Sequence, residues 1–452
     1  MKKILLLLSS ILILNISQLS ADNSLSLDKA LEMLKNKNLE IKSAKLDVDS
    51  AKEKVKTASG KHWGKLNFTQ DVVNSNDAGN VFGFKLTSRE ATFGDFGFSQ
   101  FNSKNPNILN VQPNDLNHPN ARNLFKSKLK YEVPLFTGFQ ISSYNEIMKS
   151  MVKMKALDKD KVINEKIYQL RKSYYDMALL DNSMKNLTKI LNNITKLEDM
   201  TKSMIEVGYA KKVDLLEVQA KKGNVERLLS QMRYNKELLY HYISFLLNKK
   251  ITNIEIPSTH VELPTLSDED ILSSNIDIKR ASTGLEVKRS MTNVSKSAYY
   301  PTVGAFGEVA TADNTFLGSA RNHASYTVGA HLTWNIFNGG VDAAKIQEAR
   351  IEQLKTESQV LLAKNGIKLQ LAKIRTEIET YDSEVDSLQK ELKLSNAIYK
   401  NYEGRYKEKL ASMSDVIIKQ SQQIKKVLQL QQALNKRNER IFALEKLANG
   451  DN

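Results

Sequence analysis

The sequence predicts a mainly α-helical protein with a β-barrel part, in which one structural plan is used twice. Two long stretches, Gln140–Val207 and Val341–Glu403, contain a single glycine, Gly366, and no proline. Shorter segments outside these stretches alternate apolar and polar residues. The two halves of the chain also match each other at a fixed offset. We therefore expect a tandem repeat of helix, β-hairpin, long helix and helix.

The N-terminus has the order of a secretory signal peptide. Lys2 and Lys3 precede an apolar run over residues 4–16, and Ser20-Ala21 forms a small-residue exit. Cleavage is expected after Ala21. A membrane anchor is the alternative, but the apolar run is short for a bilayer span. We expect residues 1–21 to be removed and the mature chain to be exported.

Composition narrows the class of exported protein. The chain has no cysteine, which excludes a lipidated N-terminus and disulfides. No later segment offers about 20 consecutive apolar residues, so an envelope protein of this kind is either soluble in the periplasm or inserted as a β-barrel. The net charge of +15 is spread along the helices among Glu residues, without an aromatic-interleaved patch, so no nucleic-acid partner is expected.

An internal repeat sets the domain organisation. An offset of 201 residues holds its register over more than a hundred positions, pairing Phe136 with Phe337, Gly138 with Gly339, Asp181 with Asp382, Asp214 with Asp415, Leu246 with Leu447 and Asn248 with Asn449. Upstream the offset becomes 237, with Asn38 on Asn275 and Ile41 on Ile278, so the first half holds an insertion after Trp63. We expect a first repeat over residues 22–250, a proline-bearing linker over 251–265 and a second repeat over 266–452.

The long breaker-free stretches predict helices far longer than those of a globular domain. Proline inside a helix costs about 3 kcal/mol, and all seven prolines lie outside the proposed long helices. A helix over 140–207 would be a rod of roughly 100 Å. Its apolar residues form a narrow stripe that steps by three and four, which indicates packing against neighbouring helices with much of the surface wet. An ordinary coiled coil has the same periodicity.

Four segments have the alternation of strands. Alternate positions from Tyr326 to Ile336 are apolar and the intervening ones are mostly polar, over a length close to that of a transmembrane β-strand. The predicted strands cover about 65–73, 123–136, 302–310 and 325–337, with a long extracellular loop over about 74–122. Half-buried strands of a soluble sheet are the alternative. Four strands are too few for a closed barrel, so either several chains share one barrel or these strands are not in a membrane.

Short motifs in a fixed order complete the pattern. They are Leu27-Asp28-Lys29-Ala30 with Asn38-Leu39, Tyr300-Pro301, Pro134-Leu135-Phe136-Thr137-Gly138, Asn335-Ile336-Phe337-Asn338-Gly339-Gly340, and Val207-Gly208-Tyr209-Ala210 followed by Val213-Asp214-Leu215-Leu216. Together they resemble the TolC-like outer membrane efflux protein family over residues 24–450. The family usually has Asn-Pro where this chain has Asn38-Leu39.

The resemblance implies an assembly and a role. It implies a homotrimer in the outer membrane of a Gram-negative cell, with one twelve-stranded transmembrane β-barrel continued by a periplasmic α-helical barrel. Such a protein is the exit duct of a tripartite efflux or type I secretion system. Its partners would be outer-membrane lipid, a periplasmic adaptor (membrane fusion) protein and an inner-membrane pump of the RND or ABC type.

The resemblance also implies the site residues. Helical tips that contact the adaptor would include Val207, Gly208, Tyr209, Ala210, Asp214, Leu410 and Ala411. The strand-to-helix exits would be Pro134, Phe136, Gly138, Phe337, Gly339 and Gly340. Asp415 and Tyr406 would narrow the periplasmic entrance. A second acidic position of the family is Ile418 here, and Lys409 replaces a tip glycine. Asp415 also fits an N-cap of the last helix, and Asp214 has the same two interpretations.

We expect no enzymatic chemistry. The six histidines fall in no metal-ligand spacing, and neither a phosphate-binding loop nor a nucleophile motif is present, so neither a cofactor nor a metal is expected. The alternatives from other classes are a soluble periplasmic coiled-coil adaptor, a structural envelope protein and a helical envelope enzyme. The adaptor would explain the helices but not the alternation from Tyr326 to Ile336.

Overall fold

The computed structural model describes residues 24–316, 318 and 321–449; the expected signal peptide, residues 1–21, lies outside them. The described chain forms two compact units, each assembled from both halves of the sequence. One, the helical unit, comprises the chain up to Asp49, Lys153–Thr283 and the chain from Ser358 onward. The other, the sheet unit, comprises Ser50–Val152 and Gly284–Glu357. The division falls within four helices, α2 (Leu39–Gly60), α5 (Gln140–Glu206), α8 (Ile276–Lys296) and α9 (Val341–Lys407).

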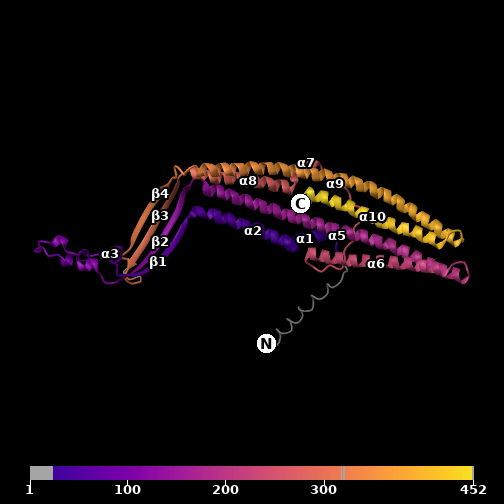
Figure 1. Ribbon diagram of the computed structural model, residues 1–452, viewed down its shortest axis with the longest axis horizontal. Coiled ribbons are helices and arrows are strands. Elements are labelled where there is room, and N and C mark those ends of the chain that lie inside the picture. Colours follow the sequence, from indigo (N-terminus) through magenta and orange to yellow (C-terminus); the bar gives the residue numbers. More distant parts are fainter. Residues whose placement is uncertain (1–23, 317, 319–320, 450–452) are drawn as a thin grey trace, which may run out of the picture. The chain divides into compact units, whose positions relative to one another are not determined.

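The two long helices match the prediction closely. Each has 67 residues and is continuous, α9 passing through Gly366 without a break. Glycine in a helix interior costs only about 1 kcal/mol, which neighbouring helix formers offset. A turn with a residue in the left-handed region ends each helix and starts the return helices, α6 (Lys212–Leu247) and α10 (Met413–Leu447) (Figure 1).

The helical unit also contains two short helices, α1 (Leu27–Lys37) and α7 (Asp268–Ser274). Its core is a series of apolar clusters along the helices. The stripe predicted from the sequence is the buried face of α5, with Ile167, Leu170, Tyr174, Met177, Leu187, Ile194 and Leu197 all at most 4% exposed. No helix among the described residues combines the length and apolar character needed to cross a membrane.

The repeat predicted from sequence appears as the same hydrogen bonds formed twice. The side-chain amide of Asn38 donates to the Leu246 carbonyl at 2.8 Å, and its oxygen accepts from the Ile41 amide at 3.0 Å. In the second half, Asn275 donates to the Leu447 carbonyl at 3.0 Å and accepts from the Ile278 amide at 3.1 Å. Each asparagine therefore caps the start of one helix and binds the end of another. The residue pairs are those that the sequence offsets match.

Backbone conformation repeats at the same offset. Gly138 and Gly339 both have left-handed φ values, 59° and 56°, and the next residues, Phe139 and Gly340, follow them into that region. The tip residues Gly208 and Lys409 repeat this conformation, as do Asn248 and Asn449, which end α6 and α10. Non-glycine residues rarely adopt this conformation. Its recurrence at four matched pairs shows that turn geometry is preserved where the side chains are not.

The sheet unit has four antiparallel strands in the order β1 (Lys65–Ser75), β2 (Arg122–Thr137), β3 (Thr302–Asp313) and β4 (Ser325–Thr333). The register places the alternating apolar residues of all four strands on the same face of the sheet. Leu129 of β2 lies beside Phe68 on one side and Val309 on the other, and Val309 lies beside Tyr326. The opposite face is polar, with Lys130 between Asn67 and Glu308.

One prediction about the strands needs correction. The fourth strand ends at Thr333, not near 337, because its partner β3 begins at Thr302, which pairs with Thr333. Beyond it Trp334 donates its indole N–H to the Tyr299 carbonyl at 3.2 Å. The long segment predicted as a loop after β1 has short helices of its own. It contains α3 (Ala78–Thr87), α4 (Asn114–Asn117) and three single-turn 3₁₀ helices, over Phe93–Phe96, Phe98–Gln100 and Ile108–Asn110.

Candidate functional sites at the helical tips and strand-to-helix exits

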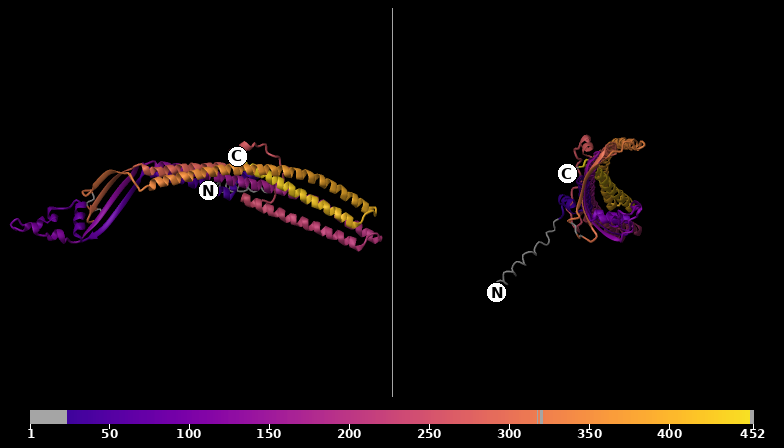
Figure 2. Two further views of the ribbon diagram at one scale, coloured as in Figure 1. Left: turned by 45° about the horizontal axis from the view of Figure 1, so that its top comes forward. Right: turned by 90° about the vertical axis from the view of Figure 1, so that its left-hand side faces the viewer.

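The two helical hairpins of the helical unit end in neighbouring turns (Figure 2). In the first turn Gly208 supplies a φ of 75°, with Val207 and Tyr209 exposed on either side and Ala210 half-buried. In the second turn Lys409 has a φ of 64°, with Leu410 exposed and Ala411 half-buried after it. The tips therefore present apolar side chains to solvent, as a surface for a protein partner would require.

A cation–π contact joins the two tips. The Lys409 ammonium lies 3.2 Å from the centroid of the Tyr209 ring. A second link is the Ser414 hydroxyl, which donates to the Glu217 carboxylate at 2.9 Å. Exposed cation–π contacts contribute roughly 0.5–1 kcal/mol. Lys409 stands where the first tip has Gly208, and its side chain links the second tip to the first.

The two aspartates of the tips are capping residues. The Ser412 backbone N–H donates to the Asp415 carboxylate at 3.1 Å, and the Asp415 N–H donates to the Ser412 hydroxyl at 3.2 Å. Ser412 is therefore the N-cap and Asp415 completes the capping box, which corrects the expectation that Asp415 itself is the cap. The Ser412 hydroxyl, which also donates to the Asp415 carboxylate at 2.6 Å, and the Ser412 backbone N–H lower the pKa of Asp415 below its usual range. Asp214 accepts from the Lys211 N–H at 2.7 Å in the matching place.

The tyrosine expected to narrow the entrance lies inside the fold. Tyr406 is only 6% exposed and packs in the apolar cluster beside Met413, Val416 and Leu197. Burial raises the pKa of its hydroxyl. In this conformation Tyr406 packs the second tip and presents almost no surface outside it.

A buried carboxylate near the tips was not recognisable in the sequence. Glu198 of α5 accepts from Lys222 of α6 at 2.9 Å and also pairs with Lys202 at 3.1 Å. These hydrogen bonds lower its pKa to about 2. The sequence signal is weak, because an acidic residue four positions before Lys202 is common on solvated helix surfaces.

The two strand-to-helix exits share a backbone conformation but differ in packing. A Cβ on Gly138 would lie 2.7 Å from the Ser297 carbonyl oxygen, whereas Gly339 and Gly340 face open space. Around Gly138, Phe139 stacks edge-on against Phe136 at 5.3 Å and against Tyr300 at 5.6 Å. Pro134 marks a register shift in β2, and Phe337 is exposed. The first exit is therefore a packed junction and the second is an open turn.

The fold, with its doubled helical hairpins and four-stranded sheet, is that of an outer-membrane channel. CusC, described in terms of transmembrane channel formation, superimposes with a TM-score of 0.78 at 13% identity, covering 94% of this chain and 92% of its own. The outer membrane protein VceC of Vibrio cholerae gives 0.75 at 12% identity, covering 94% and 96%. The outer membrane channel CmeC of Campylobacter jejuni gives 0.75 at 14%, covering 94% and 85%.

The sequence model of the outer membrane efflux protein family matches residues 269–450. This match supports the resemblance seen in the motifs. No curated protein matches the chain in sequence. For residues before 269, the likeness to the solved channels shows the same fold.

Proposed function

We propose that this chain is the outer-membrane exit duct of a tripartite efflux or type I secretion system. Three copies would form one twelve-stranded barrel and a periplasmic helical tunnel, which conducts substrates passively from an inner-membrane pump of the RND or ABC type. The helical tips would contact a periplasmic adaptor, and the mature protein would lie in the outer membrane with a large periplasmic extension.

The observation that carries the proposal is the apolar face of the open sheet. Nine large side chains on this face are 41–80% exposed: Leu66, Phe68, Val72, Leu129, Tyr131, Val309, Tyr326, Val328 and Leu332. A soluble protein rarely exposes so large a patch. Within the described residues the outer edges of β1 and β4 pair with no other strand. Lipid on the face and neighbouring copies at the edges would satisfy both features.

Cross-linking of the two edges tests the shared barrel. The chain has no cysteine, so a double variant with one cysteine at Thr69 of β1 and one at Thr327 of β4 has no other thiol to react. With a flexible bismaleimide in isolated outer membranes, we expect the double variant to give covalent dimers and trimers. The matched control carries cysteines at Lys128 and Ala310, which are partners within one chain and should give only monomers. Monomers from both variants, or recovery in the periplasmic fluid, would contradict the proposal and favour the soluble adaptor.

The entrance at the tips is a second part of the proposal. The Asp415 carboxylate is partly exposed. The positive charges of Lys419 and Arg405 contribute to lowering its pKa. In a trimer three copies of this group would surround the entrance. Because Ile418 occupies the other acidic position, we expect one acidic ring there and correspondingly weak binding of cations.

A further inference from the structure

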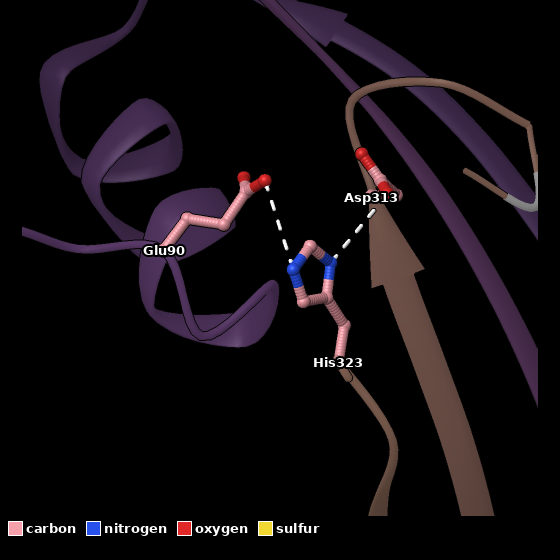
Figure 3. A group of neighbouring side chains, drawn as sticks. All are labelled: Glu90, Asp313 and His323. Atoms are coloured by element: carbon pink, nitrogen blue, oxygen red, sulfur yellow. Dashed lines mark ion pairs between the residues drawn. The ribbon is translucent and has the colours of Figure 1, made fainter. Parts of the chain in front are cut away.

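Three side chains of types that can bind a metal lie close together at the end of the sheet opposite the strand-to-helix exits (Figure 3). Glu90 follows α3, Asp313 is the last residue of β3, and His323 precedes β4. One ring nitrogen of His323 and one oxygen from each carboxylate lie within 4.8 Å of one another. His323 Nδ1 is 3.5 Å from Asp313 Oδ2, and Nε2 is 3.8 Å from Glu90 Oε1.

The three groups are largely shielded from solvent, and Arg122 holds one oxygen of Glu90. The side chains of Asp313, His323 and Glu90 are 8%, 12% and 31% exposed. Arg122 pairs with Oε2 of Glu90 and leaves Oε1 directed at His323.

We propose that Glu90, Asp313 and His323 bind a divalent transition-metal cation of the zinc type. One imidazole and two carboxylates are ligands that zinc accepts, and water would complete a tetrahedral shell. The contacts of 3.5 and 3.8 Å use different ring nitrogens, and only one of them can bind a given ion. One ring nitrogen and one oxygen of each carboxylate lie within 4.8 Å of one another, whereas ligand atoms in such a shell lie about 3.3 Å apart, so the three side chains would move closer together on binding. An adjoining polar hollow of about 820 Å³, lined in part by Arg122, Asn314 and Thr315, gives an entry path.

The ion would join two segments that are distant in sequence. Glu90 lies in the insertion between β1 and β2, whereas Asp313 and His323 flank the turn between β3 and β4. Without an ion, the insertion is held by the ion pair of Glu90 with Arg122 of β2 and by the contact of Glu90 with His323. The His323 ring is itself positioned within the β3–β4 hairpin, where its Nδ1 is 3.1 Å from the Ala312 carbonyl. The competing explanation is therefore an ion-pair contact that binds no metal.

Metal analysis of the purified protein separates these explanations. Full-length mature protein without a histidine tag is treated with a chelator in detergent, equilibrated with micromolar ZnCl₂ and analysed by plasma mass spectrometry. We expect about one Zn²⁺ per chain, and a visible Co²⁺ spectrum of tetrahedral intensity after substitution. His323→Gln and Glu90→Gln should both lose the ion. The matched control His331→Gln changes a histidine on the polar face of β4, away from the cluster, and should keep it.

A second measurement guards against misfolded variants. Trypsin cleavage after Lys85 and Arg89 should slow when Zn²⁺ is added to wild type. The effect of zinc should vanish in Asp313→Asn. This variant preserves the local fold, because its side-chain oxygen can still accept from the Asn314 N–H. Absence of bound zinc in wild type, or equal zinc in wild type and His323→Gln, would overturn the proposal and leave an ion-pair contact only.

Discussion

Glu198 illustrates how a single buried charge stabilises the tip end of the helical unit. Its carboxylate joins α5 to α6 through Lys222, and Gln219 adds a weaker hydrogen bond at 3.3 Å. Glu198→Gln should lower the free energy of unfolding by about 1–3 kcal/mol, because Lys222 loses a charged acceptor. Thermal unfolding followed by circular dichroism measures the loss. Asp386→Asn, which breaks the exposed pair with Lys390, is the control and should change little.

The same residue gives a pH prediction. Its pKa is lowered to about 2 in the folded state, from an ordinary value near 4.5. A carboxylate with a depressed pKa contributes stability that is complete above its unfolded pKa and is lost as pH falls through the folded value. The difference in unfolding temperature between wild type and Glu198→Gln should therefore be constant from pH 7 to about 5 and shrink as pH approaches 2. A difference that disappears already at pH 5 would contradict this assignment.

Asp415 tests whether a capping residue also affects conduction. Asp415→Ala removes the capping box of α10, so amide exchange in the first turn should become several-fold faster. Asp415→Asn keeps an oxygen acceptor and removes the charge. If the carboxylate forms part of the entrance, both variants should raise conductance or weaken cation block in planar bilayers. If it only caps the helix, Asp415→Asn should conduct like wild type.

At the scale of elements, paired asparagines hold the ends of helices together. Asn38 and Asn275 are 4% and 3% exposed, and each binds a terminal carbonyl of a distant helix. Asn38→Ala should cost about 1–3 kcal/mol, from the lost cap and the orphaned Leu246 carbonyl. Asn275→Ala should cost a similar amount. Asn401→Ala, at an exposed position in α9, should be neutral or slightly stabilising in the same unfolding measurement.

The elements show what sequence patterns can and cannot predict. The long helices and strands follow from breaker spacing and alternation, because both patterns reflect local burial. The partners of Asn38 do not, since the Leu246 carbonyl is 208 residues away and leaves no mark on the sequence. The cluster of Glu90, Asp313 and His323 could not be predicted from ligand spacing for the same reason, because the sheet register and the folded insertion bring these residues together.

Tyr406 shows a different limit. Its position relative to the tip was clear from sequence, but an aromatic side chain at a helix end suits both a core and an entrance. In the described conformation the side chain belongs to the apolar cluster that contains Met413 and Val416. The turn at Lys409 was also not predictable from sequence. Its backbone is left-handed, and lysine rarely adopts that conformation.

At the scale of the whole molecule, the two faces of the sheet should tolerate charge very differently. Val328 lies on the apolar face near the middle of β4, and its neighbour Thr327 lies on the polar face opposite Glu308. An arginine on a lipid-facing position near the bilayer centre costs about 2–4 kcal/mol, whereas one on the water-filled side costs little. Val328→Arg should therefore reduce the amount of trimer recovered from outer membranes, while Thr327→Arg should assemble like wild type.

The two substitutions differ by one residue and add the same side chain, so general effects on synthesis or export should affect both equally. Trimer is quantified by semi-native electrophoresis without boiling, and total protein by boiling the same samples. Equal recovery of both variants would mean that the apolar face does not meet lipid. The exposed apolar face would then have to be covered by protein, and the single shared barrel would lose its main support.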